Sequence, residues 1–574
     1  MSSERPSPQP EGTPSYPPTL VQASSVPQKR ALEDDHQPAI SSPLNPDFRP
    51  SKPADDAPLA RERASRAKKE SLKKRESKGP LTTESSARST PDPKGPITKQ
   101  KKKAAPPAPT RYKLPAPKLS DFEAPKPPIF VDAHEKMAPD GRTIAFKETT
   151  EHVYNKRSFH YVHCIADPAF PSSQYYRQTE AEPFGPRFAF EDKSSHMFLD
   201  ESGKHITTDR GFRMAKANVG VRQGRWYWEC KITSGIPNRK RSEAGQESTN
   251  GHVRMGWARR EATLDAPVGF DAYSYGLRDA KGQKVFMSRP KDFFPPGQEI
   301  QEGDVIGLEI NLPSETLHRK VVEGQYNPAV DLVDDEPSPV ETAHIIRERV
   351  PIRFKAHLYF ERIDYHPSKE LEDLMNPSPV ISSQGGLGGA TQKPGPTHPS
   401  PALRTLPHSS IKVYKNGVLM GTPFTDLLAF LPPASKPSSL HDAREGLDDG
   451  MLGYYPAVSV FRGGAAEVNF GPDFWYPPPD YGTQGDVEMT GSDQAPSSGL
   501  KKLRAIGERY DEQIVEDIVY DIVDEVDFWL QDGGVSGKGA TAGVLRASAG
   551  VPTHYGLGGG VVGSEIKELV QDDE

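Results

Sequence analysis

The stretch that decides the fold reads Gly220-Val-Arg-Gln-Gly224-Arg-Trp-Tyr-Trp228-Glu-Cys-Lys-Ile232. After Gly224 the residues alternate, so that Trp226, Trp228, Cys230 and Ile232 fall on one face, and Tyr227, Glu229 and Lys231 on the other. A period of two is typical of a half-buried β-strand. Because two tryptophans bring a large apolar area that another sheet must cover, we predict that this strand is central in a sandwich or barrel.

Further short strands are predicted along the chain. The apolar sets are Val253, Met255 and Trp257; Ile306, Leu308 and Ile310; and Phe354, Ala356, Leu358 and Phe360. Asn416-Gly417 between two apolar runs favours a tight hairpin, and a second hairpin is expected around Asp200–Gly203. Many short strands joined by Gly and Pro turns predict an all-β fold, an antiparallel β-sandwich.

Composition divides the chain into six segments. With 59 prolines and 49 glycines in 574 residues, we expect one folded unit with polar flanks. The predicted segments are 1–115, a disordered basic Pro/Ser-rich region; 116–184, an extended arm packing on the domain; 185–477, the sandwich; 478–498, a linker; 499–531, an amphipathic helix; and 532–574, a flexible Gly-rich tail with an acidic end. Within the sandwich, long disordered insertions are expected at 234–250, 366–408 and 432–449.

The cysteines and the lack of long apolar runs limit the class of protein. Cys164 and Cys230 are the only two, which excludes a disulfide framework or a zinc finger with several thiolates and predicts a reducing compartment. No apolar run suits a membrane span or a signal peptide, so we expect a soluble protein that is not secreted.

Basic clusters in the N-terminal region are candidates for a nuclear-localisation sequence. The residues are Lys73, Lys74, Arg75, Lys101, Lys102 and Lys103. Short Lys/Arg runs of this kind serve either as nuclear addresses or as non-specific contacts to nucleic-acid phosphates. A solvated charged tail without a specific role is the third interpretation.

The segment Leu500–Leu530 is the one strongly helical stretch. At 100° per residue, one face carries Ile514, Val515, Ile518, Val519, Ile522, Val523, Val526, Trp529 and Leu530, and the other carries Glu516, Asp517, Asp521, Asp524 and Asp527. Its β-branched residues give it poor intrinsic helicity, so the apolar face needs a covering partner. Either another protein covers it, or the helix folds back on the sandwich.

No pattern in the sequence indicates an enzyme. Gly558–Gly563 fits a G-x-G-x-x-G spacing, but no strand precedes it, so we interpret it as part of a flexible tail. No catalytic triad, P-loop or metal-ligand spacing is recognisable, and the histidines are scattered. Cys164 is better explained as a structural thiol than as a nucleophile. We therefore predict no catalytic residue, no cofactor and no metal ion.

The quoted motifs resemble a known family. Gly220–Glu229 is similar to the early core strand of SPRY domains. Arg254–Trp257, Ala266–Tyr275, Gly303–Pro313, Tyr359–Arg362, Tyr414–Val418 and Val468–Phe474 together resemble the absent, small or homeotic discs subunit of the COMPASS histone methyltransferase complex. Animal members carry an N-terminal zinc-finger and winged-helix module, for which this chain has neither the cysteines nor the packed length. The resemblance is therefore to a fungal-type member.

The resemblance implies a non-catalytic nuclear scaffold that activates methylation of lysine 4 of histone H3 by a SET-domain subunit. A WD40 subunit is expected to bind Phe212, Arg254, Pro267 and Arg278, with Lys281 added from the same basic segment. A small dumpy-type helical dimer is expected to bind the C-terminal helix through Val515, Ile518, Val519, Ile522 and Val526. The nucleosome would be contacted indirectly, or by the basic tail. The alternative is a substrate adaptor of a ubiquitin ligase, which would need a RING, SOCS box or LisH/CTLH segment.

Overall fold

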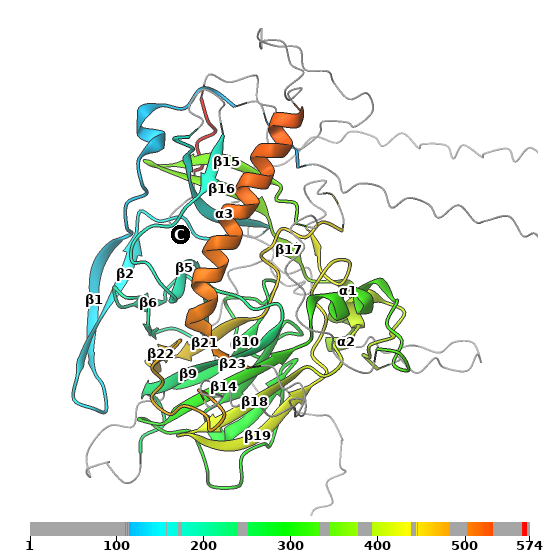
Figure 1. Cartoon of the computed structure of the whole chain (residues 1–574). Helices are drawn as coiled ribbons and strands as arrows, with labels where there is room; N and C mark the ends of the chain where they lie inside the picture. Colours follow the sequence, from blue (N-terminus) through cyan, green and yellow to red (C-terminus); the bar gives the residue numbers. More distant parts are fainter. Residues whose placement is uncertain are drawn as a thin grey trace, which may run out of the picture. The chain divides into compact units, whose positions relative to one another are not determined.

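The fold is described from a computed structural model (Figure 1). It describes residues 109–110, 112, 114–155, 158–169, 175–238, 251–331, 345–376, 393–437, 444, 446–482, 502–531 and 565–570. Most of the regular elements among these residues are strands of antiparallel sheets, which confirms the predicted all-β class. The basic clusters of the N-terminal region, the insertion 239–250 and the glycine-rich pattern at 558–563 lie outside the described residues.

The larger sheet of the sandwich has ten strands. In spatial order they are β1 (Ile129–Met137), β2 (Thr143–Thr150), β6 (Phe198–Leu199), β7 (His205–Thr207), β22 (Ala465–Asn469), β9 (Gly224–Ser234), β14 (Val305–Leu312), β18 (Ser410–Lys415) and β19 (Val418–Thr425), with β23 (Leu503–Ala505) pairing β9 in parallel. The segment with Trp226 and Trp228 forms β9, which pairs with a strand on each side, as predicted for a central strand. The β18–β19 hairpin turns at Asn416 and Gly417, both at positive φ.

The second sheet covers the tryptophan face of β9. Its order is β13 (Arg289–Lys291), β12 (Gln283–Phe286), β11 (Ser274–Arg278), β10 (His252–Ala258), β21 (Tyr455–Phe461), β8 (Arg213–Ala217) and β5 (Phe188–Lys193). Trp228 of the first sheet meets Trp257 of the second edge to face, with ring centroids 6.2 Å apart. Trp226, Cys230 and Ile232 join the same core, as their spacing predicts.

The opposite face of β9 is also buried, which the half-buried interpretation did not anticipate. Tyr227 and Glu229 are both 0% exposed. The carboxylate of Glu229 accepts hydrogen bonds from the backbone N–H groups of Trp475 (2.7 Å) and Tyr476 (2.8 Å). The segment after β22 therefore folds back over this face and satisfies the buried charge.

A third sheet replaces the extended arm expected at 116–184. It consists of β15 (Arg349–Phe354), β16 (His357–Ile363), β3 (Phe159–Ala166) and β4 (Tyr176–Gln178). Residues 129–150 of the same segment form β1 and β2 of the first sheet. The apolar set from Phe354 to Phe360 is not one strand, because Lys355 adopts a positive φ and turns the chain between β15 and β16.

The described residues include three α-helices. α1 (Glu315–Glu323) is capped by the Ser314 hydroxyl and ends at Gly324 in the left-handed conformation. α2 (Lys369–Met375) buries Leu371 against the second sheet and lies within the insertion expected to be disordered. A two-stranded sheet, β17 (Tyr365–His366) with β20 (Lys436–Pro437), also lies in these insertions. α3 (Ile506–Gln531) is the predicted C-terminal helix.

Neither cysteine is available for chemistry. Cys164 is 1% exposed and Cys230 0%. Burial raises the pKa of both thiols far above the ordinary range, so both are protonated at neutral pH and act as structural residues. Among the described residues, no helix combines the length and the apolar composition that a membrane span requires.

Candidate binding surfaces

The first candidate surface is a pair of arginines on adjacent strands, here called the arginine pair. Val253 and Met255 of β10 are fully buried, so the alternation of the strand turns Arg254 away from the core. Arg254 lies directly opposite Arg278 of β11 in the antiparallel register. Two like charges are thereby held side by side.

Aromatic packing holds Arg254 in place. Its guanidinium lies over the ring of Phe212, 4.6 Å from the ring centroid, and Phe212 in turn packs on Phe461 at 4.9 Å. Burial, and then the neighbouring charge of Arg278, lower the pKa of Arg254 to about 10. The side chain is still protonated at neutral pH, and its charge would be stabilised by an anion.

The other residues predicted for this site lie close by in the fold. Pro267 precedes Val268, whose N–H donates to the hydroxyl of Ser459 (3.0 Å), and Ser459 pairs with Arg254 across β10 and β21. Lys281 is exposed in the turn that follows β11. Within the described ranges, neither Arg254 nor Arg278 has a carboxylate partner, because nearby Asp279 binds His252 and backbone N–H groups. The arrangement suits a carboxylate or phosphate ligand.

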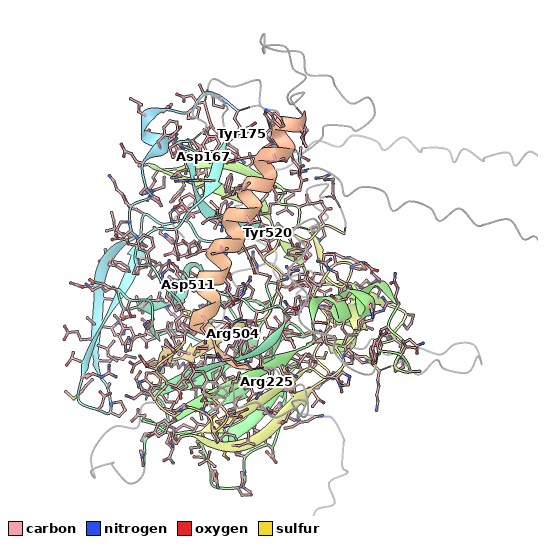
Figure 2. The ribbon with its side chains drawn as sticks, in the orientation of Figure 1. Asp167, Tyr175, Arg225, Arg504, Asp511 and Tyr520 are labelled. Atoms are coloured by element: carbon pink, nitrogen blue, oxygen red, sulfur yellow. The ribbon has the colours of Figure 1, made fainter. Side chains whose placement is uncertain are left out.

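The second candidate surface is α3, which contacts β9 and β23 at its start and β4 further along (Figure 1). Figure 2 shows Arg225 and Arg504 near the β23 end of the helix, and Tyr175 near the other end. The guanidinium of Arg504 lies 4.4 Å from the Trp226 ring, and Tyr175 stacks on Phe528 at 6.1 Å. The helix is thus attached along its whole length.

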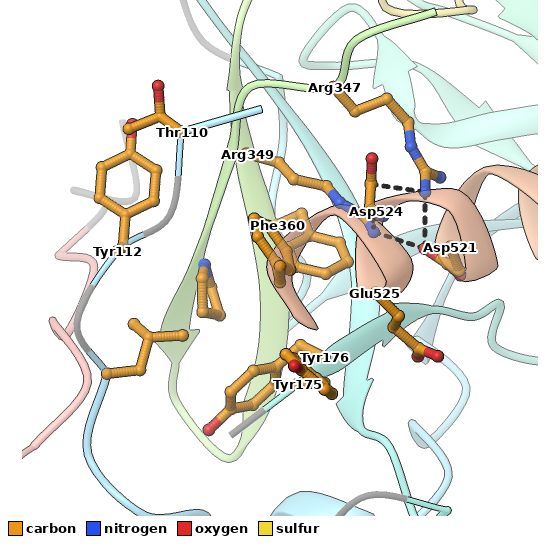
Figure 3. A pocket seen from close by; sticks show the side chains of 13 residues that line it. Thr110, Tyr112, Tyr175, Tyr176, Arg347, Arg349, Phe360, Asp521, Asp524 and Glu525 are labelled. Carbon is orange, nitrogen blue, oxygen red and sulfur yellow. Dashed lines mark hydrogen bonds and ion pairs between the residues drawn. The ribbon is translucent and has the colours of Figure 1, made fainter. Parts of the chain in front are cut away.

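The side of α3 that packs on the protein is its acidic face. Asp521 and Asp524 are buried and each lies 2.8 Å from Nη2 of Arg347, while Arg349 pairs with the same two carboxylates (Figure 3). The backbone N–H of Gln178 donates to Asp521 (3.0 Å). A cavity of about 50 Å³ lies at this interface, and the arginines and aspartates that line it already pair with one another.

The apolar face of α3 therefore points away from the protein. The exposed side chains on it are Ile514, Val515, Ile518, Val519, Ile522, Val526, Trp529 and Leu530, here called the apolar strip. Val515 is 61% exposed, and Ile518 and Ile522 are 54% exposed. The helix does fold back on the chain, which is one of the two predicted alternatives, but it does so without covering this strip.

The interactions that orient α3 could not be identified from the sequence. The helical period marked Asp521 and Asp524 only as members of a polar face. Their partners Arg347 and Arg349 stand more than 170 residues earlier in the sequence. The sequence around these two arginines shows no periodic pattern that would mark them as partners of the helix. The only available sign was a run of acidic residues on one face of a helix, and such a face is usually solvated.

Comparisons with known proteins agree with the resemblance. The chain is 58% identical to the COMPASS component cclA of Colletotrichum higginsianum, and the alignment spans the full length of both proteins. It is 36% identical to the Set1 complex component ash2 of Schizosaccharomyces pombe, over 88% of this chain and 60% of that protein. A crystal structure of a human SPRY domain matches 49% of this chain and 98% of that one at 11% identity and a TM-score of 0.22, too low to support an argument.

No family model matches the chain. The relatives are named as components of a complex, in line with the prediction that this chain is a subunit and not the catalytic protein. Identity of 58% over two complete chains is sufficient to assign the family that the motifs of the sandwich suggested. The chain therefore belongs to the COMPASS component cclA family.

Proposed function

We propose that this chain is a non-catalytic scaffold subunit of a nuclear complex that methylates lysine 4 of histone H3, and that it activates the SET-domain subunit. Support comes from relatives named as components of COMPASS and of the Set1 complex. One further relative, from Drosophila melanogaster, is named a subunit of a Set1/Ash2 histone methyltransferase complex. A scaffold acts by holding partners, so its function depends on surfaces and not on a catalytic site.

The arginine pair is proposed to bind an acidic segment of the WD40 subunit. Two adjacent guanidinium groups without a carboxylate partner among the described residues can each pair two oxygens of a carboxylate or phosphate. The Phe212 ring under Arg254 limits the conformations of that side chain before the ligand arrives. Pro267 and Lys281 complete the proposed surface.

The apolar strip of α3 is proposed to bind a small helical dimer of the dumpy type. The observation that carries this proposal is the orientation of α3, with buried aspartates on one side and exposed Ile518 and Ile522 on the other. An amphipathic helix with anchors three to four residues apart is recognised by an apolar groove between helices. Val515, Val519 and Val526 lie beside the two central anchors.

A double substitution tests this docking helix. Ile518→Glu combined with Ile522→Glu should abolish binding of the dimer in a calorimetric titration, because docking would bury two unpaired carboxylates. Both side chains are exposed, so the melting transition of the sandwich should stay unchanged. Asp511→Lys, at an exposed position on the same helix, is the control and should bind normally. Retained binding by the double variant would rule out the strip as the docking site.

A further inference from the structure

Three potential metal ligands converge where the sheets meet. His152 follows β2 of the ten-stranded sheet, His163 lies in β3 of the four-stranded sheet, and Glu191 lies in β5 of the seven-stranded sheet. One ligand atom from each residue lies within 4.8 Å of the other two. None of the three residues belongs to either proposed binding surface.

The distances in this cluster are those of ligands rather than of hydrogen bonds. Nε2 of His152 lies 3.6 Å from Oε1 of Glu191, and Nε2 of His163 lies 3.7 Å from the same oxygen. Both separations exceed the hydrogen-bond range. Ligands bound at 2.0–2.1 Å to a tetrahedral zinc ion are roughly 3.3 Å apart, and the two histidine–glutamate separations lie within a few tenths of an ångström of that spacing.

Buried nitrogen atoms in the cluster have no hydrogen-bond partner. His152 is 5% exposed and His163 6%. Nε2 of His152 and Nδ1 of His163 make no hydrogen bond to the described part of the chain. An unsatisfied buried polar atom costs about 1–3 kcal/mol, and a metal ion would remove that cost for the His152 nitrogen that faces Glu191.

The surroundings of the two rings also suit ligation. The His163 ring packs on Tyr359 with centroids 4.3 Å apart, which fixes its plane. The His152 ring packs edge to face on Tyr154 with centroids 5.7 Å apart, which holds its plane as well.

We propose that His152, His163 and Glu191 bind a Zn²⁺ ion. Two imidazoles and one carboxylate are a donor set that zinc accepts, and a water molecule can complete four-coordination. Since His163 and Glu191 lie in strands of two different sheets and His152 lies just after β2 of a third, the ion would link the four-stranded sheet to both sheets of the sandwich. Its role is structural, and it does not depend on the proposed partners.

The test is a titration of the full-length protein with zinc chloride after treatment with a chelator and desalting. The wild-type protein should bind one Zn²⁺ tightly in competition with a chromophoric chelator, and Glu191→Gln and His163→Gln should each weaken that binding by about 100-fold or more. Zinc should raise the melting temperature of the wild type and not that of the variants, because the three ligands come together only in the folded state.

A matched control separates ligation from general damage to the fold. His160→Gln removes another buried histidine of β3, one that contacts Asn155 and lies outside the cluster, and it should leave zinc binding intact. Cobalt substitution gives a second measurement on the unaltered protein, since Co²⁺ in a four-coordinate site absorbs visible light. If the wild type binds no zinc tightly, or if Glu191→Gln binds it as well as the wild type, the site does not exist.

Discussion

Arg254 and Arg278 hold two like charges opposite each other on β10 and β11. If an acidic segment of the WD40 subunit neutralises them, reversing one charge should remove an attraction and add a repulsion. Arg254→Glu is expected to weaken binding of that subunit by about 2–5 kcal/mol in a titration. The fold should be unaffected, because Arg254 points away from the core.

The control for this substitution lies on the same sheet. Lys291→Glu makes the same charge reversal at an exposed position of β13, three strands away from β10. It should change the affinity little, because exposed charges are screened. If the wild type and Arg254→Glu bound the WD40 subunit with equal affinity, the arginine pair would not be part of the interface.

His205 should make the stability of the sandwich depend on pH. It lies between Asp200 (Nδ1 to Oδ2, 3.1 Å) and Glu467 (Nε2 to Oε1, 3.4 Å). Burial lowers its pKa, but the two carboxylates outweigh burial and raise the pKa to about 9, against 6.5 ordinarily. The folded state holds this proton between pH 6.5 and 9 while the unfolded chain releases it. The free energy of unfolding should therefore fall as pH rises through this window.

The size of this loss is about 3 kcal/mol when the whole window is crossed. Urea denaturation of the wild type at intervals from about pH 6 to about pH 10 would measure it. His205→Gln cannot be protonated, so its stability should vary much less over the same range. An equally steep decline in this variant would assign the pH dependence to another group.

At the scale of the element, five ion pairs to Arg347 and Arg349 hold the acidic face of α3 against the protein. Asp521→Asn combined with Asp524→Asn removes the two carboxylates closest to the guanidinium groups of Arg347 and Arg349 and leaves only Asp517 of the described partners, 4.0 Å from Arg347, which costs about 3–5 kcal/mol. We expect the helix to detach and its amides to exchange hydrogen faster, while the sandwich keeps its melting transition. Asp511→Asn on the exposed side should leave exchange unchanged. Slow exchange in the double variant would mean that other contacts hold the helix.

Sequence periodicity predicted those elements in which the apolar residues lie on one face and that face is buried. β9, β10 and β14 form as expected because Trp228, Met255 and Leu308 repeat with a period of two and must meet a second sheet. The same reasoning was wrong at Phe354–Phe360, since a hairpin with apolar residues in both arms preserves the alternation across its turn. α2 was missed because it has only two turns and its buried residue is Leu371. A single buried leucine gives no helical period that the sequence could show.

For the candidate surfaces, the sequence indicated which side chains point outward better than it indicated what surrounds them. The outward direction of Arg254 follows from its place between Val253 and Met255, and the apolar strip follows from the helical period. The cation–π contact with Phe212 and the aspartate–arginine pairs under α3 join residues far apart in sequence. Such contacts depend on the tertiary fold, so no local pattern reveals them. Binding of the two predicted partners stays a prediction.

For the whole molecule, the start of the folded part can be located by truncation. Thr110 donates to Glu348 (3.2 Å), Leu114 and Phe122 pack on the four-stranded sheet, and Asp121 pairs with Arg353 (2.6 Å). These contacts begin before residue 115, where the sequence placed the boundary. Removal of 1–108 should leave the melting temperature unchanged, whereas removal of 1–123 should lower it by roughly 4 °C or more. Scanning calorimetry measures both, and equal values would show that these contacts contribute nothing.

The position of β9 also constrains the order in which the chain can fold during its synthesis. Its partners arrive late: β22 brings Asn469, 240 residues after Glu229, and β23 follows near the end of the described sequence. Until then the edge of a strand with two tryptophans has no neighbour on that side, and long-range pairing of this kind is slow. The nascent protein must therefore pass through a stage in which this central strand lacks its neighbours on one side, when chaperones would protect it from aggregation.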